Sequence, residues 1–316
     1  MSEIQLKDYG TREAWLASRT TAIGASEVAG LFVDASGESL SPYTTPFKLW
    51  AEKTGQLPPA EVNAEWIHWG NLLEPAIAAR YQEVTGRELW QGGPFCVAQH
   101  ADIPMFRSTP DRWVTLAADR GGRGLVQLKN TAAFFGRNWA DGAPLHISIQ
   151  CQAELATTGY DWDSVAVLIG GNTFKYFDLD RDDDFIAELE DRVRWFWDLV
   201  ARREAPPIDG SARTLAAIKA LHPKDNGETV RLTEEAIAWF DAMQSAKADA
   251  KLAEAAAEWA HAKLLHAIGP ATFGELPDGR KLSLKTTDNK GGTTMVDPYS
   301  YRTLRLEKKP AKGKTT

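Results

Sequence analysis

GGRGLVQLKN, residues 121–130, combines a glycine pair with the alternating pattern of a strand. Glycine pairs suit tight hairpin turns, because glycine adopts backbone angles that other residues rarely reach. Side chains on a strand alternate between its two faces, so Gln127 and Lys129 should share one face while Val126 and Leu128 point into the core. We therefore predict a strand over residues 124–130 with two polar side chains on one side.

Asp111 follows Pro110 shortly before this turn. A hairpin would fold Asp111 back beside Gln127, so that a carboxylate, an amide oxygen and the Lys129 ammonium converge at one sheet edge. Such a group can hold Mg²⁺ through hard oxygen ligands and activate water for attack on a phosphodiester. The same residues also fit an ordinary turn and a solvated strand face, because Pro-Asp is common in turns. On these residues alone both interpretations stay open.

Helical and strand-like segments alternate around this hairpin. Helices are expected at 11–19, 46–54, 64–85, 145–158 and 182–204, and further strands at 95–99, 105–108, 112–116, 164–169 and 173–179. Gly86 and Gly159 follow two of these helices, as glycine often does at a helix end. Pro75 is expected to kink or restart the helix that contains it. The order of segments predicts an α/β core.

The composition of the chain changes near Pro206. Tryptophan, glycine and strand-like runs are frequent before it, whereas residues 232–268 are rich in alanine and helical in pattern. A short strand pair and a basic, lysine-rich tail follow. We predict a core over residues 1–205 and a mainly helical C-terminal extension over residues 206–316.

Charge and cysteine content exclude several classes of protein. The 316 residues carry a formal net charge of −7, which argues against a broadly basic nucleic-acid coat. A nuclease is compatible with this negative net charge, since it needs positive charge only around its metal centre. Cys96 and Cys151 form no CxxC pair, so a zinc or iron–sulfur site is not expected. No secretory signal is visible and no apolar run approaches the ~20 residues that cross a bilayer, which favours a reducing cytoplasm and no membrane association.

Glu74, Arg19, Ser26 and Thr109 are further candidates. Glu74 lies among apolar neighbours, so it is either buried with a partner or exposed on a helix surface. Ser26 precedes an expected helix start, where free backbone N–H groups favour a phosphate, and arginine suits bidentate phosphate contact. A simple helix cap is the alternative interpretation of Ser26.

Taken together, these segments resemble the YqaJ-type phage recombination exonucleases, relatives of phage lambda exonuclease in the PD-(D/E)xK superfamily. The resemblance covers roughly residues 12–206 and rests on an ordered set of segments: Arg19 with IGASE (23–27), WGNLLEP (69–75), STPD (108–111), QLK (127–129) and QCQ (150–152). It implies a restriction-endonuclease-like α/β core and an exonuclease that depends on Mg²⁺, with Mn²⁺ able to substitute. Such an enzyme digests one strand of linear duplex DNA 5′→3′ and leaves 3′ single-stranded overhangs for phage-type homologous recombination.

The resemblance also implies roles for individual residues. The implied site comprises Glu74, Asp111 and Gln127 as metal ligands, Lys129 as the catalytic lysine, Gln150 as the residue that positions metal-bound water, and Arg19, Ser26 and Thr109 as a pocket for the DNA 5′-phosphate. Gln152 is a weaker candidate, and serine is commoner than threonine at position 109. Implied partners are double-stranded DNA ends, a single-strand annealing protein and further copies of the chain in a ring, with a trimer as one candidate. A phage or prophage gene in a bacterial host is the implied origin.

Gln127 departs from the family pattern, which usually has glutamate there. An amide oxygen can coordinate Mg²⁺, but it brings no negative charge and cannot act as a base. Three explanations stay open: an engineered substitution, a natural variant that still works, and a weakened or inactive protein that only binds DNA ends. A site-specific endonuclease on the same fold is a further alternative. From the sequence, Gln127→Glu is expected to raise Mg²⁺-dependent cleavage by orders of magnitude.

Overall fold

A computed structural model describes residues 4–59 and 65–284, apart from the side chain of Trp66. It divides into two compact units, Met1–Pro223 and Lys224–Thr316. This division falls later than the composition change near Pro206, because helix α7 (Ala212–Leu221) packs against helix α3 (Pro46–Lys53) of the first unit. The buried hydroxyls of Thr45 and Thr214 are 2.7 Å apart in that contact.

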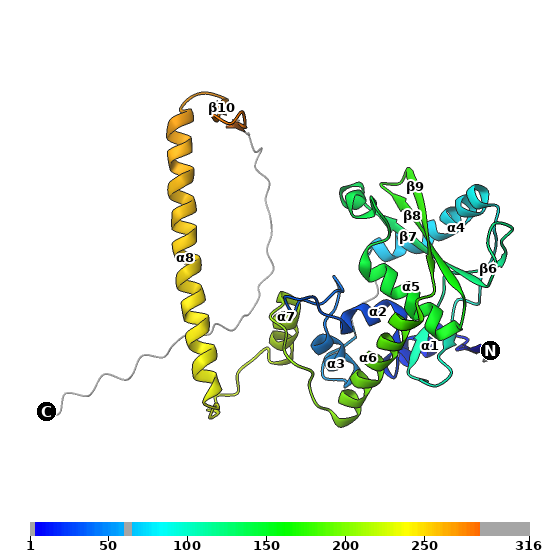
Figure 1. The fold of residues 1–316 in the computed structure, drawn as a ribbon. Coiled ribbons are helices and arrows are strands. Elements are labelled where there is room, and N and C mark those ends of the chain that lie inside the picture. The colour runs from blue at the N-terminus through cyan, green and yellow to red at the C-terminus, as the bar shows by residue number, and fades with distance from the viewer. Residues whose placement is uncertain (1–3, 60–64, 285–316) are drawn as a thin grey trace. The chain divides into compact units, whose positions relative to one another are not determined.

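The five-stranded sheet of the first unit has the order β3-β6-β7-β8-β9. Its strands are β3 (Glu88–Trp90), β6 (Arg112–Leu116), β7 (Gly124–Thr131), β8 (Trp162–Ile169) and β9 (Thr173–Asp180). The predicted hairpin is confirmed, since β6 and β7 pair antiparallel with Arg112 opposite Val126. Strand β7 also pairs in parallel with β8, so the chain between them must cross over the sheet. That crossover holds helix α5 (Leu145–Thr158), which Figure 1 shows beside the sheet.

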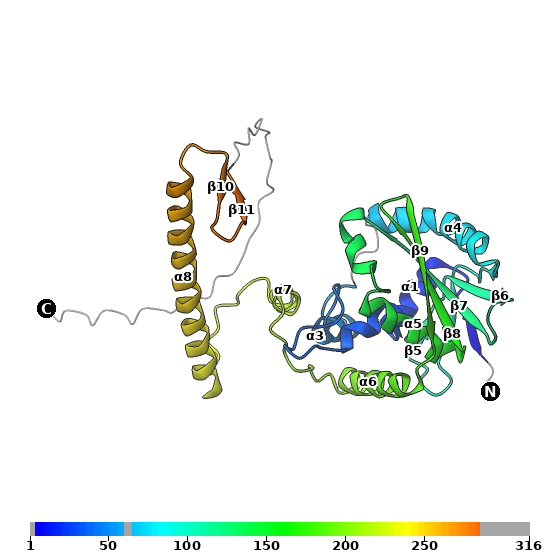
Figure 2. The same ribbon diagram turned by 45° about the horizontal axis from the view of Figure 1, so that its top comes forward.

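Helices cover both faces of strand β7. On one face, Val126 and Leu128 pack with Ile77 and Tyr81 of helix α4 (Glu65–Thr85). The opposite face, which carries Gln127, lies toward α5 (Figure 2). The predicted alternation is therefore confirmed, but the polar face is covered by a helix instead of being solvated, and Gln127 is only 1% exposed.

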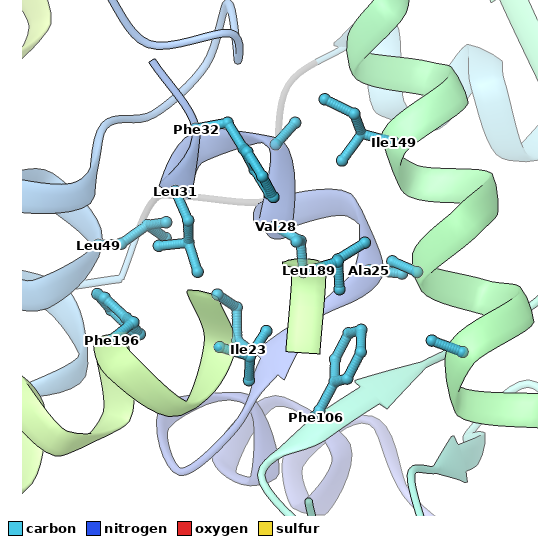
Figure 3. Packing of buried hydrophobic residues seen from close by; sticks show 14 of the residues in the cluster. Ile23, Ala25, Val28, Leu31, Phe32, Leu49, Phe106, Ile149, Leu189 and Phe196 are labelled. Carbon is cyan, nitrogen blue, oxygen red and sulfur yellow. The ribbon is translucent and has the colours of Figure 1, made fainter. Parts of the chain in front are cut away.

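A second sheet has the order β1-β4-β5-β2. Its strands are β1 (Gln5–Asp8), β4 (Cys96–Gln99), β5 (Phe106–Ser108) and β2 (Ile23–Gly24). Helix α1 (Arg12–Thr20) connects β1 to β2, and helix α2 (Ala25–Val28) and the 3₁₀ turn η1 (Ala29–Leu31) follow β2. Helix α6 (Asp183–Arg202) completes this layer. Figure 3 shows the core between them, where Ile23 and Phe106 lie near Leu189 and Phe196 of α6. This packing fixes the α1–α2 segment that carries the predicted phosphate residues.

Helix α4 is one helix through Pro75, so of the two expected outcomes, a kink or a restart, the restart does not occur. Proline has no N–H group, and the Asn71 carbonyl therefore lacks its usual helical partner four residues on. The packing of Ile77 and Tyr81 against the sheet keeps the helix together across this gap. Glu74 lies directly before the proline.

In its described residues, the second unit holds helix α8 (Glu235–Ile268) and the antiparallel pair β10 (Phe273–Glu275) and β11 (Lys281–Ser283). The predicted helix and strand pair are confirmed, and the lysine-rich tail lies outside the described residues. Within the described part of α8, no residue is buried. Among the helices that the structure describes, none combines the length and apolar character needed to span a bilayer.

Candidate functional site

A cleft of about 530 Å³ opens in the first unit. Its lining includes every residue of the site that the family resemblance implies, namely Arg19, Ser26, Glu74, Thr109, Asp111, Gln127, Lys129 and Gln150. They come from helices α1, α2, α4 and α5, from strand β7 and from the loop between β5 and β6. The topology therefore brings together residues that are far apart in the sequence.

Asp111 lies in the loop that leads into strand β6. Its Oδ2 accepts a hydrogen bond of 2.8 Å from the Leu128 backbone N–H, which fixes the carboxylate against β7. Burial raises the pKa of Asp111 above its ordinary value, and the nearby Lys129 ammonium opposes that rise. The position of Asp111 beside β7 is the one that the hairpin predicts.

Glu74 approaches the same region from helix α4. Its Oε2 is 3.8 Å from Arg112 Nη1, and its side chain is 30% exposed. Burial, followed by the charge of Asp111, raises the pKa of Glu74 to about 7. Two carboxylates that repel each other in a partly desolvated cleft form a favourable environment for a cation.

Gln127, Gln150 and Glu154 form a buried hydrogen-bonded group in the lining of the cleft. Gln127 Nε2 lies 2.7 Å from both carboxylate oxygens of Glu154, and Gln150 Nε2 donates to Gln127 Oε1 at 2.9 Å. Lys129 Nζ donates to Gln150 Oε1 at 3.2 Å. The lysine is therefore connected through Gln150 to the amide–carboxylate pair.

Glu154 was not identified from the sequence, although it lines the cleft and is 1% exposed. Burial raises the pKa of its carboxyl well above the ordinary value, and the charges of Asp163 and Asp111 act in the same direction. A signal for it was present, because Glu154 follows Gln150 by one helical turn and lies between Ala153 and Leu155 in an apolar helix. A charged residue in such a helix requires a partner.

The predicted phosphate residues Arg19, Ser26 and Thr109 line the same cleft. Arg19 Nη2 is 3.4 Å from Glu27 Oε1, and Lys53 Nζ is 2.9 Å from Glu27 Oε2. Glu27 also accepts a 2.9 Å hydrogen bond from the Gly24 N–H. Neither Glu27 nor Lys53 was assigned a role from the sequence, yet Glu27 pairs with the Arg19 side chain and Lys53 donates to the Arg19 carbonyl at 2.8 Å.

Gln152, the weaker candidate, has a structural position away from the cleft lining. Its Nε2 donates to the Asp180 carbonyl at 2.7 Å and its Oε1 accepts from the Asp182 N–H at 3.0 Å. These bonds join α5 to the junction between β9 and α6. The contacts of Gln152 are therefore those of a residue that anchors a helix.

The donor set of the cleft fits a hard divalent cation. Glu74 and Asp111 offer carboxylate oxygens, while Gln127 and Gln150 offer amide oxygens, and oxygen is the ligand atom that Mg²⁺ prefers. Within the described ranges, no group of three or more His, Cys, Asp or Glu side chains is arranged to hold a metal by itself. Two carboxylates supplemented by neutral amides are consistent with that finding.

Comparisons with known proteins point to one family. Residues 14–161 match the family described as YqaJ-like viral recombinase domain. The chain is 28% identical over 228 residues to the uncharacterized protein YqaJ of Bacillus subtilis (strain 168). The aligned region covers 71% of this chain and 67% of that protein.

Solved structures that are similar to the chain include two exonucleases. The alkaline exonuclease LHK-Exo of Laribacter hongkongensis is 24% identical with a TM-score of 0.47, and the match covers 60% of this chain and 93% of that one. A phage-related exonuclease from Haemophilus somnus 129PT is 12% identical with a TM-score of 0.44, over 58% of this chain and 96% of that one.

The matched family region runs from helix α1 to the end of the crossover before β8. It contains Arg19, Glu74, Asp111, Lys129 and Gln150, and therefore the segments that meet in the cleft. Residues 14–161 of the chain match the YqaJ-like viral recombinase domain, the family that its motifs resemble.

Proposed function

We propose that this protein is a metal-dependent exonuclease that digests one strand of linear duplex DNA in the 5′→3′ direction. The observation that supports this most is the convergence of Glu74, Asp111 and Lys129, from a helix, a loop and a strand, on one cleft. The product would carry 3′ single-stranded overhangs, which suit a single-strand annealing protein. We place the protein in a bacterial cytoplasm, in phage-type recombination, as a ring of several copies.

Glu74 and Asp111 would hold the divalent cation, with Gln127 as a neutral oxygen donor. When bound, Mg²⁺ supplies Lewis acidity at the phosphodiester and lowers the pKa of water, and Mn²⁺ offers the same chemistry. Lys129 places its ammonium where negative charge develops on the phosphate during attack. Gln150 holds the lysine through the 3.2 Å contact and can orient the attacking water with its amide. The backbone N–H of Leu128 keeps Asp111 in place.

The choice of substrate tests this function. With Mg²⁺ and a 5′-phosphorylated linear duplex, we expect progressive loss of one strand, while closed circular DNA stays intact. Nicking of the circle would indicate an endonuclease instead. Tight binding of ends without strand loss would support the second candidate, a protein that binds DNA ends without cutting, which the neutral Gln127 favours.

Arg19→Ala is expected to remove the preference for 5′-phosphorylated over 5′-hydroxyl ends. Arginine binds phosphate through two parallel hydrogen bonds, which alanine cannot replace. The fold should persist, because Lys53 still pairs with Glu27 at 2.9 Å. Initial rates on the two substrates measure the preference. Arg194→Ala, which changes an ion-paired residue on helix α6, is the matched control. Survival of the preference in Arg19→Ala would show that the phosphate is bound elsewhere.

A further inference from the structure

Glu154 is the acceptor at which a short chain of hydrogen bonds from Lys129 ends. Its carboxylate belongs to helix α5 and is 1% exposed. Gln127 Nε2, from strand β7, lies 2.7 Å from each carboxylate oxygen, and Gln150 Nε2 donates to Oε1 at 3.0 Å. Both oxygens of Glu154 therefore already accept from amide groups, so this carboxylate is not offered to a cation.

The direction of the Gln150 amide depends on these contacts. Its Nε2 donates to Gln127 Oε1 at 2.9 Å and to Glu154 Oε1 at 3.0 Å, so the nitrogen end of the amide faces two acceptors. The oxygen end is left for Lys129, whose Nζ donates to Gln150 Oε1 at 3.2 Å. A reversed amide would set N–H groups against the ammonium, which has donors and no acceptor. The contact with Lys129 therefore requires acceptors at the other end of Gln150.

We infer that Glu154 is a positioning residue for the cleavage reaction. It orients the Gln150 amide, and through that amide it holds the Lys129 ammonium at the cleft without binding the cation itself. Gln127 keeps Glu154 in place by donating to it. This inference rests on the proposed function, because it assigns a residue that acts through the lysine of that same cleft.

A carboxylate suits this position because it offers two acceptor oxygens and no donor. Burial of a carboxylate in an apolar helix is costly unless hydrogen bonds replace the lost water. The amides of Gln127 and Gln150 provide those bonds, and bonds to an ionised acceptor are stronger than bonds between neutral groups. In Glu154→Gln, one acceptor becomes a donor that faces the Gln127 amide nitrogen. The amides must then turn, and Gln150 loses its fixed direction.

The same contacts change the expectation for Gln127→Glu. A glutamate there would place a second buried carboxylate where Gln127 now donates to Glu154. Two buried carboxylates in such close contact repel each other. The sequence predicts faster cleavage from this change, whereas on this inference cleavage becomes slower, because the group that orients Gln150 is disturbed.

A kinetic series on the full-length protein, with Mg²⁺ and a 5′-phosphorylated duplex, tests this inference. Glu154→Gln should lower kcat about tenfold or more. Its KM for the duplex, and its Mn²⁺ affinity measured by calorimetry without DNA, should stay within about threefold of wild type, since neither substrate nor cation contacts Glu154. Gln150→Leu should lower kcat as well. Because Glu154 acts through Gln150, the double variant should be no slower than Gln150→Leu alone, whereas independent losses would multiply.

Asp163→Asn is the matched control. Asp163 is fully buried on strand β8, outside the cleft lining, and its Oδ1 accepts from the Ser164 N–H as asparagine also can. Its kcat should stay within about threefold of wild type, because it is not part of the chain of bonds to Lys129. Tm is measured for every variant. Glu154→Met, an apolar side chain of similar length, takes the place of Glu154→Gln if that variant does not fold.

Crystal structures of wild type and Glu154→Gln, grown without metal or DNA, give a result that does not depend on cleavage. Lys129 Nζ should contact the Gln150 side-chain amide in wild type and lose that contact in the variant. The inference is overturned if the variant keeps the contact, keeps the wild-type kcat or loses Mn²⁺ binding, if the double variant is slower than Gln150→Leu, or if Gln127→Glu cleaves faster than wild type. A wild type that degrades no DNA contradicts the proposed function, whereas the two crystal structures still decide whether Glu154 positions Lys129.

Discussion

Asp111→Asn is expected to lower metal-dependent cleavage of linear duplex DNA by about a thousandfold. Asparagine keeps the shape of the side chain, and its Oδ1 can still accept from the Leu128 N–H as Asp111 does now at 2.8 Å. The change therefore removes the charge that holds the cation while preserving the hydrogen bond that fixes the loop. Initial rates on a 5′-phosphorylated duplex with saturating Mg²⁺ measure the effect.

Stability and an exposed control separate this effect from misfolding. The Tm of Asp111→Asn should stay within about 3 °C of wild type, since the hydrogen bond is retained. Asp191→Asn, at a side chain that is 84% exposed on helix α6, should cleave at the wild-type rate. Wild-type cleavage by Asp111→Asn would exclude this carboxylate as a required metal ligand.

Arg87→Met should cost about 3 kcal/mol of folding free energy, because it removes the charged hydrogen bonds that the buried guanidinium makes to Asp178 and to the buried Tyr81 hydroxyl. The Arg87 side chain is 3% exposed and makes 2.8 Å bonds to both oxygens of Asp178 and a 2.6 Å bond to the Tyr81 hydroxyl. Its guanidinium also lies 4.7 Å from the centre of the Trp162 ring. Asp119, its other partner, is half exposed and can turn to water. Urea denaturation measures the loss.

Arg202→Met is the control for this substitution, since Arg202 is 55% exposed in its ion pairs and should contribute about 1 kcal/mol or less.

A pH series adds a second check. Burial raises the pKa of Asp178, but hydrogen bonds from Arg87 and Ser164 outweigh it and hold the pKa below 3.8. The stabilisation is therefore complete above pH 3.8 and lost as the pH falls through the lower, folded value. Arg87→Met should weaken this dependence, because the Ser164 hydroxyl then remains hydrogen-bonded to Asp178, at 2.7 Å. Equal stability of Arg87→Met and wild type at neutral pH would contradict the account.

Local pattern was sufficient to predict the hairpin and the strand that carries Lys129. The glycine pair marks the turn, and the alternation from Leu125 to Lys129 specifies which side chains share a face. Because Asp111 precedes that hairpin closely, its place beside Leu128 follows from the same short stretch. The segments that resemble the YqaJ-type family are of this kind too, since each is a short run of sequence.

Features that depend on distant pairing were not predictable in the same way. Strand β1 pairs Gln5 with Gln99, and Arg87 meets Asp178 only after the sheet has formed. Glu154 faces Gln127 because strands β7 and β8 pair in parallel and α5 crosses between them. A short stretch of sequence around Glu154 shows a charged residue in an apolar helix. It does not show which strand that residue faces in the folded protein.

Anomalous diffraction from a crystal of the full-length protein with Mn²⁺ and a 5′-phosphorylated duplex tests the assignment of the cleft. We expect a manganese peak within about 2.5 Å of carboxylate oxygens of Glu74 and Asp111, with a DNA phosphate beside it and Lys129 facing that phosphate. A duplex bound elsewhere on the protein, with manganese absent from the cleft, would contradict a metal-dependent cleavage site at these residues.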